Sequence, residues 1–182
     1  MTNKILEDFV TAESVSLEMI EKYKTKLPKQ IIQIWQEYGF GSFMNGFMKV
    51  VNPEKFQDLA ERVYCMGYKS VPIFVTGLGD MIVWEEGTYL TVLRFRHGIF
   101  SIMEKGCNFF LNDLTDDDYV EEFFKPQNYY IALKDQGTIA YDECFGYVPL
   151  LCLGGSESPD NLEKVKALEY MELIYSISGS VG

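Results

Sequence analysis

The sequence has very little of the side-chain chemistry on which most enzymes depend. Its 182 residues contain one histidine, His97, and four cysteines, none of them in a CxxC pair. A serine hydrolase needs a histidine base beside its nucleophile, and the chain has no G-x-S-x-G motif. Zinc sites use closely spaced pairs of ligands, which are also missing. We therefore expect no catalytic residue, no metal site and no cofactor.

Signals for export and for membrane insertion are missing too. No apolar run approaches the roughly 18 residues of a transmembrane helix. The first residues include Glu7 and Asp8 and lead into no apolar segment of the kind that a signal peptide needs. We therefore expect a cytoplasmic protein whose cysteines stay reduced. All four cysteines are expected to be small core residues: Cys65, Cys107, Cys144 and Cys152.

Basic residues are scarce in the last two-thirds of the chain. The net charge is −11, and residues 1–70 contribute nothing to it, with nine basic and nine acidic side chains. Residues 71–182 carry seven basic and eighteen acidic side chains. Such a surface repels phosphate backbones and anionic lipids, which argues against direct binding of nucleic acids or membranes. It attracts a basic protein partner, although solubility alone also accounts for a negative charge.

The sequence does contain both helical and strand patterns. Apolar residues at helical spacing predict three helices within residues 1–70, one of them beginning at Asn52-Pro53. Short β-rich runs separated by turns predict an antiparallel meander over residues 71–103. Helices are predicted again at residues 115–125 and 128–135, and a last one from Ser158. Pro149 lies within an extended apolar run, as in an edge strand or a bulge.

These elements predict an α+β fold. We expect a mainly antiparallel sheet of about five strands, with N-terminal, middle and C-terminal helices packed around it. Trp35 and Trp84 lie on apolar faces of predicted elements and are expected to anchor the core. Because no linker-like stretch separates the elements, we expect one compact body.

The densest acidic cluster lies at the start of a predicted helix. Its members are Asp116, Asp117, Asp118, Glu121 and Glu122. Carboxylates at this position interact favourably with the helix dipole, which is a sufficient structural reason for them. Two functional interpretations stay open: a patch for a basic partner, and a divalent-metal site, since Asp117 and Glu121 share a helix face. Two acidic pairs beside predicted turns are further partner-surface candidates: Glu85-Glu86 and Asp142-Glu143.

Two groups of motifs resemble known domains. Residues 1–110 resemble the GAD-like domain of bacterial immunity proteins, through Ile34-Trp35, Tyr38-Gly39-Phe40-Gly41 and Asn52-Pro53-Glu54. Residues 111–182 are similar to the C-terminal domain that follows it in type VI secretion immunity proteins. The motifs of this second segment are Cys144-Phe145-Gly146-Tyr147-Val148-Pro149, Leu153-Gly154-Gly155 and Asn161-Leu162-Glu163-Lys164-Val165.

The resemblance implies a non-enzymatic immunity protein that binds a DNase toxin in the cytoplasm and occludes it. A DNase domain is basic because it binds a polyanion, so the acidic charge of this chain agrees with that implication. Most matching residues are expected to be structural, with Gly39, Gly146, Gly154 and Gly155 at turns that need positive φ. Two other classes stay open. One is a ligand-sensing module whose pocket lies among the aromatic residues of 40–47, and the other is a metal-dependent enzyme that uses the carboxylates of 116–122.

Overall fold

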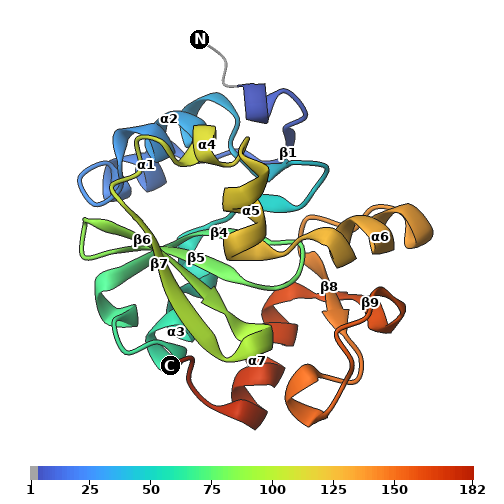
Figure 1. Cartoon of the computed structure of the whole chain (residues 1–182). Helices are drawn as coiled ribbons and strands as arrows, with labels where there is room; N and C mark the ends of the chain where they lie inside the picture. The colour runs from blue at the N-terminus through green and yellow to red at the C-terminus, as the bar shows by residue number, and fades with distance from the viewer. Residues whose placement is uncertain (1–3) are drawn as a thin grey trace.

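Nine strands and seven α-helices make up residues 4–182, the part of the chain that the computed structural model describes (Figure 1). Seven strands form one antiparallel sheet in sequence order, and the last two form a separate antiparallel pair. The strands are β1 (Val10–Glu13), β2 (Phe40–Phe43), β3 (Met48–Val50), β4 (Ser70–Thr76), β5 (Met81–Glu85), β6 (Tyr89–Arg94), β7 (Ile99–Lys105), β8 (Glu143–Tyr147) and β9 (Leu162–Lys166). The helices are α1 (Leu17–Tyr23), α2 (Lys29–Glu37), α3 (Pro53–Val63), α4 (Phe110–Asp113), α5 (Asp117–Phe124), α6 (Gln127–Gln136) and α7 (Ala167–Ser178).

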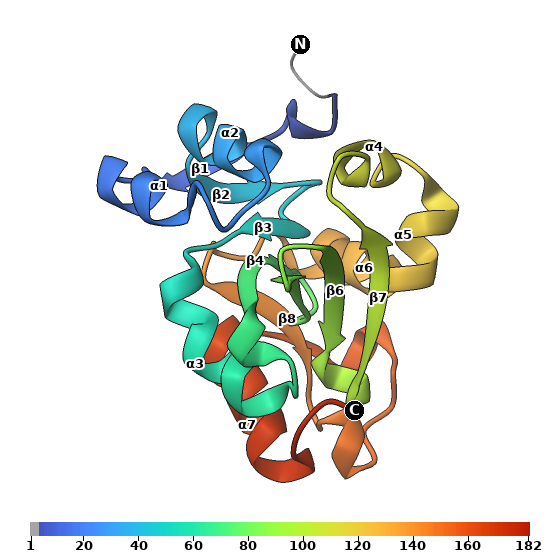
Figure 2. The same cartoon turned by 90° about the vertical axis from the view of Figure 1, so that its left-hand side faces the viewer.

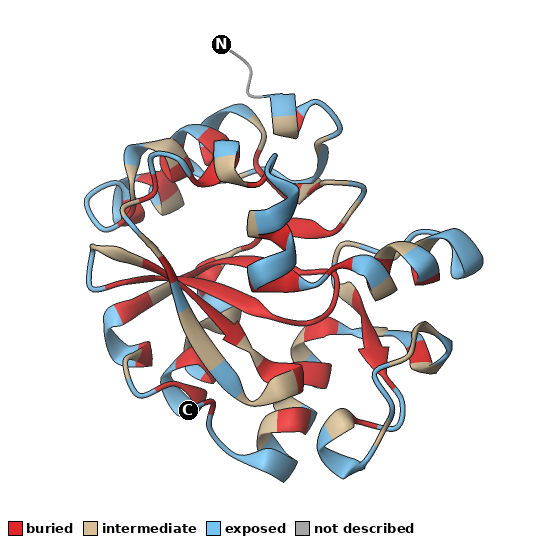
Figure 3. Ribbon diagram, in the orientation of Figure 1, coloured by how far each residue is buried: buried red, intermediate tan, exposed pale blue. Residues whose placement is uncertain are grey.

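The sheet has two apolar faces because side chains alternate along each strand. In β5, Ile82 and Trp84 belong to one core cluster, whereas Met81 and Val83 belong to the other. Helices α1, α2, α4, α5 and α6 contribute to the first cluster, and α3 and α7 to the second. Figure 2 shows α3 to the left of the strands and α4 and α5 to the right. The central strands are accordingly buried (Figure 3).

The sheet has more strands than the five or so that we predicted. The predicted meander is confirmed as β4 to β7. The additional strands are β1, β2 and β3, which are three or four residues long and extend the sheet beyond β4. Strands this short carry too few residues to show an alternating pattern, so the sequence does not reveal them.

The last helix begins at Ala167 and not at Ser158, so this prediction was wrong. Ser158 caps a 3₁₀ turn, and the following residues form β9, in which Val165 lies opposite Cys144 of β8. Leu162 and Val165 have helical spacing relative to Leu168, but their pairing with a segment far back in the chain overrides that local pattern.

Glycine is required in this chain for two different reasons. Gly39 and Gly154 adopt positive φ of 82° and 87°, as predicted. Gly146 and Gly155 do not, so for them the prediction was wrong. Gly146 lies within β8, where a Cβ atom would approach the Tyr170 ring to 2.6 Å, and a Cβ atom on Gly155 would overlap a backbone carbonyl group. At these two positions the constraint is space and not backbone conformation.

Of two further motif residues, Gly41 and Pro149, the second lies elsewhere than predicted. Gly41 is part of β2, opposite Thr11 of β1, where the neighbouring backbone leaves no room for a side chain. Pro149 follows β8 instead of interrupting a strand, and its peptide bond with Val148 is cis.

The predicted helix start and core anchors are confirmed. The Asn52 side chain accepts a hydrogen bond from the Glu54 amide, and Pro53 occupies the first position of α3. Trp35 and Trp84 are both buried.

The prediction for the cysteines is half right. Cys107 and Cys144 are buried in the two core clusters, but Cys65 and Cys152 are exposed, and all four are free thiols. No helix within residues 4–182 is both long and apolar enough to cross a membrane.

An ion pair between Asp80 and Arg96 lies inside the core. Asp80 immediately precedes β5, Arg96 follows β6, and their charged groups are 3.5 Å apart with both side chains buried. Burial raises the pKa of the Asp80 carboxyl group, and the Arg96 guanidinium opposes that shift. Arg96 Nη2 also donates a hydrogen bond of 2.6 Å to the carbonyl oxygen of Phe124, the last residue of α5. The pair therefore connects the central sheet to the second half of the chain.

We expect Arg96→Met to lower the free energy of unfolding by about 3–5 kcal/mol, because it leaves a buried carboxyl group without its counter-charge. Urea unfolding monitored by circular dichroism measures this loss. Arg62→Met is the matched control, since Arg62 pairs with Asp58 and Glu172 at the surface. A loss in Arg96→Met no larger than that in Arg62→Met would contradict the assignment.

Candidate partner-binding surface

Helix α5 presents a row of carboxylates to solvent. Asp116 is its N-cap, one residue later than predicted, and its side chain accepts a hydrogen bond of 2.9 Å from the Asp118 amide. The opposite side of the helix is apolar and buried through Val120, Phe123 and Phe124. All five acidic residues of the predicted cluster are exposed: Asp116, Asp117, Asp118, Glu121 and Glu122. Figure 3 shows both the buried and the exposed side of this short helix.

The orientation of α5 follows from contacts at its C-terminal end. Phe124 lies edge-on to Phe47, with ring centroids 6.0 Å apart, and its carbonyl oxygen accepts the hydrogen bond from Arg96. Tyr119 and Phe123 are in ring contact with each other at 4.9 Å. Because the aromatic residues fix one side of the helix against the core, the acidic residues have to face outward.

The carboxylates on α5 are not neutralised by their neighbours. Among the ion pairs of residues 4–182, none involves an acidic residue of α5 or its N-cap. Two further acidic residues lie close by, Glu104 at the end of β7 and Asp113 at the end of α4. Burial, together with the charge of Asp113, raises the pKa of Glu104 to about 7. We call these residues, together with the five on α5 and its N-cap, the acidic face.

The other predicted acidic pairs are not part of the acidic face. Glu85 was predicted to lie in a turn, but it is a buried residue of β5 whose carboxylate accepts hydrogen bonds from Tyr64 (2.8 Å) and Thr91 (2.7 Å). This burial removes Glu85 from the candidate surface. Its neighbour Glu86 is exposed and pairs with Lys69 at 2.7 Å.

Asp142 and Glu143 lie at the start of the β8–β9 pair. Asp142 forms an ion pair of 2.7 Å with Lys166, and a Glu143 carboxylate oxygen accepts a hydrogen bond from the Ala140 amide. The Lys166 ammonium, through its hydrogen bond and its charge, lowers the pKa of the Asp142 carboxyl group. These two residues therefore carry less free negative charge than the acidic face.

No three His, Cys, Asp or Glu side chains within residues 4–182 are grouped so as to hold a metal ion. Asp117 and Glu121 lie on the same helix, as the spacing predicted, but Glu121 accepts a hydrogen bond from Gln127. His97 is partly buried in a 3₁₀ turn after β6, and its Nε2 atom is 3.0 Å from a Glu157 carboxylate oxygen.

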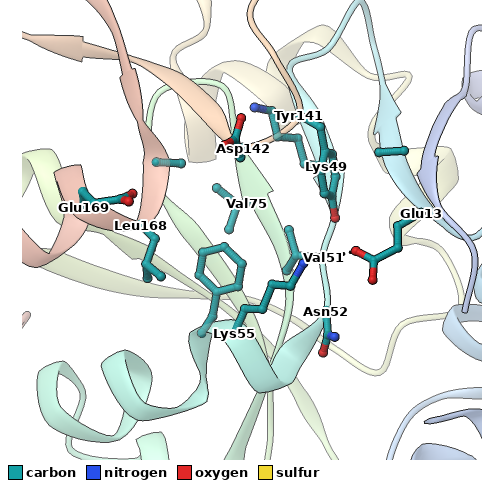
Figure 4. A pocket seen from close by; sticks show the side chains of 13 residues that line it. Glu13, Lys49, Val51, Asn52, Lys55, Val75, Tyr141, Asp142, Leu168 and Glu169 are labelled. Carbon is teal, nitrogen blue, oxygen red and sulfur yellow. Dashed lines mark hydrogen bonds and ion pairs between the residues drawn. The ribbon is translucent and has the colours of Figure 1, made fainter. Parts of the chain in front are cut away.

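A cavity that sequence analysis missed lies where the two halves of the chain meet (Figure 4). It has a volume of about 250 Å³. Glu13 and Lys55 lie on one side, Asp142 and Glu169 lie on others, and Val75 forms part of the apolar floor (Figure 4). The single indication in the sequence is a lysine within the apolar run Phe47-Met48-Lys49-Val50-Val51.

Lys49 is the unusual residue of this cavity. Its side chain is buried, and its ammonium group donates hydrogen bonds to the carbonyl oxygens of Ala140 (3.0 Å) and Glu143. Burial lowers the pKa of Lys49 to about 8. Phe40, Phe43 and Phe47, the aromatic residues of the expected pocket, are core residues, and the hollow beside this segment is lined by Ser42, Asn45 and Gly46.

Comparison with known families separates the chain into two parts. The model of the GAD-like domain matches residues 2–95, more than half of the chain. The chain belongs to the GAD-like family. Residues 104–178 match the model of the T6SS immunity protein Tdi1, C-terminal, so the GAD-like domain is followed here by an immunity-protein domain. Both resemblances inferred from the motifs are thus confirmed.

The fold is also found in a solved structure. The chain is similar to the crystal structure of Atu4351 from Agrobacterium tumefaciens, with a TM-score of 0.74 and 18% sequence identity. The match covers 96% of this chain and 88% of that chain. A search among curated proteins returned no match.

The raised pKa of Glu104 predicts how pH affects stability. The folded protein holds this proton more tightly than the unfolded chain, so its contribution to stability is lost as pH rises from about 4.5 through about 7. Glu104→Gln removes that dependence. We expect the free energy of unfolding of the variant, relative to that of the parent, to be higher at pH 8 than at pH 5. Urea unfolding at both pH values measures this difference. An identical difference at the two pH values would refute the assignment.

Proposed function

We propose that this protein is an immunity protein that binds a cognate type VI secretion toxin through its acidic face. The observation that carries the proposal is the set of exposed carboxylates on α5 and its N-cap, which lack ion-pair partners and stand on a helix held rigidly against the core. Unpaired charges of one sign attract a partner of the opposite sign and accelerate its association.

The partner that fits this surface is a basic nuclease domain. A nuclease presents positive charge where it binds the phosphate backbone, and an acidic inhibitor covers the same region. We propose inhibition by occlusion in the cytoplasm, without catalysis by the immunity protein. The match of residues 104–178 to an immunity-protein domain supports this role.

The charge of the acidic face is tested by reversing part of it. We expect Asp116→Lys combined with Asp117→Lys to slow association with the toxin about tenfold or more at low salt, with little change in dissociation. Glu18→Lys combined with Glu37→Lys changes the net charge equally on exposed residues of α1 and α2, and is the matched control. Stopped-flow measurement at two salt concentrations gives both rates. Equal on-rates for the two double variants would exclude steering by α5.

A ligand-binding module is a second candidate, and the cavity beside Lys49 is the observation that favours it. A small ligand in that cavity would contact both halves of the chain and raise the melting temperature. Thermal-shift measurements with nucleotides and common metabolites test this. A ligand that stabilises the parent but not Lys49→Met would support the module, and a flat screen would count against it.

A further inference from the structure

A second surface of the molecule is apolar. Around one hollow, between α7 and the loop that follows β8, lie four aliphatic side chains that are 42%, 62%, 49% and 44% exposed: Val148, Leu153, Leu173 and Ile177. The hollow has a volume of about 490 Å³, and of the described residues that line it only Lys166 and Glu169 are charged. In Figure 1 the loop lies beside the lower part of α7. We call this surface the apolar groove.

The apolar groove is a fixed feature of the fold. Leu173 and Ile177 are one turn apart on α7, which is anchored in the core through the buried side chains of Met171 and Ile174. The loop is closed on itself by hydrogen bonds from the Gly155 amide to the Leu150 carbonyl oxygen (3.0 Å) and from the Val148 amide to Asn161 (2.8 Å). A preformed apolar surface costs little conformational entropy when a partner binds it.

Exposed apolar surface of this kind marks a binding site, because water contact with clustered aliphatic side chains is unfavourable. The other exposed large hydrophobic side chains of residues 4–182 come from six parts of the chain outside this groove, and only Ile99 and Ile102 share an element, β7. They are Val10, Leu17, Tyr68, Ile99, Ile102, Phe109 and Ile131.

Charge decides what the groove binds. Residues 142–178, which contain it, carry seven acidic and two basic side chains, a net charge of −5. A second copy of this chain would bring the same −5 against it, and like charges across an interface oppose association. A basic protein with aliphatic side chains satisfies both the apolar lining and the charge around it.

We propose that the apolar groove is the anchoring site for aliphatic side chains of the basic toxin. This inference rests on the proposed function and assigns it a second surface. The acidic face accelerates encounter, whereas the groove holds the complex together, because desolvated apolar anchors slow dissociation and distant charges mainly affect association.

The test is calorimetric and kinetic titration of the purified chain with the toxin domain encoded beside its gene. We expect Leu173→Ser combined with Ile177→Ser to weaken binding about tenfold to hundredfold through faster dissociation, with an unchanged on-rate. Leu153→Ser, in the loop on the other side of the groove, should weaken binding in the same way without altering α7. Ile131→Ser on α6 is the matched control, since Ile131 is 44% exposed, as Ile177 is.

Each result decides a different question. If the parent binds the toxin and the groove variants bind equally well, the groove assignment is overturned while the proposed function stands. If the parent does not bind the toxin at all, both are overturned. Sedimentation of the parent alone tests the other possible occupant, a second copy of this chain. If the parent is a dimer, and Leu173→Ser combined with Ile177→Ser converts it to a monomer, the groove binds a second copy instead of the toxin.

Discussion

The buried pair of Asp80 and Arg96 is the interaction on which the arrangement of the molecule depends. A charge pair inside an apolar core costs desolvation energy, and the loss of either partner leaves the other charge buried and unpaired. Here Arg96 joins the carboxyl group before β5 to the last carbonyl group of α5. The sheet and the helix that bears the acidic face are thereby held by one guanidinium group. The position of α5 on the surface therefore depends on a contact made in the core.

The two candidate surfaces differ in chemistry and in origin. The acidic face is formed by β7, α4 and α5 and carries charge without ion-pair partners in the described residues. The apolar groove is formed by α7 and the loop after β8 and carries almost no charge. Long-range charge attraction mainly raises the association rate of a complex, and a desolvated apolar anchor mainly lowers its dissociation rate. A tight inhibitor of a basic enzyme therefore uses both. This chain presents an acidic face and an apolar groove on separate elements.

Several residues of the family motifs serve packing inside the fold, whereas Val148 and Leu153 of the C-terminal motifs line the apolar groove. Gly146 makes room for Tyr170, and Trp35 is enclosed between Tyr23 and Phe40. Such residues preserve the fold that carries the surfaces. The acidic face, by contrast, is built from side chains outside those motifs.

By itself the sequence determined the fold class, the meander of β4 to β7, the start of α3 at Asn52-Pro53, and the acidic cluster at the start of α5. Each of these is a local pattern, in which the period, the cap or the charge lies within a few residues. Only the tertiary structure decided that Glu85 is buried, that residues 162–166 pair with β8, that Lys49 lies in a cavity, and that Val148 and Leu153 meet Leu173 and Ile177. Those features depend on segments far apart in the chain, and no local pattern records which distant segment will lie beside them.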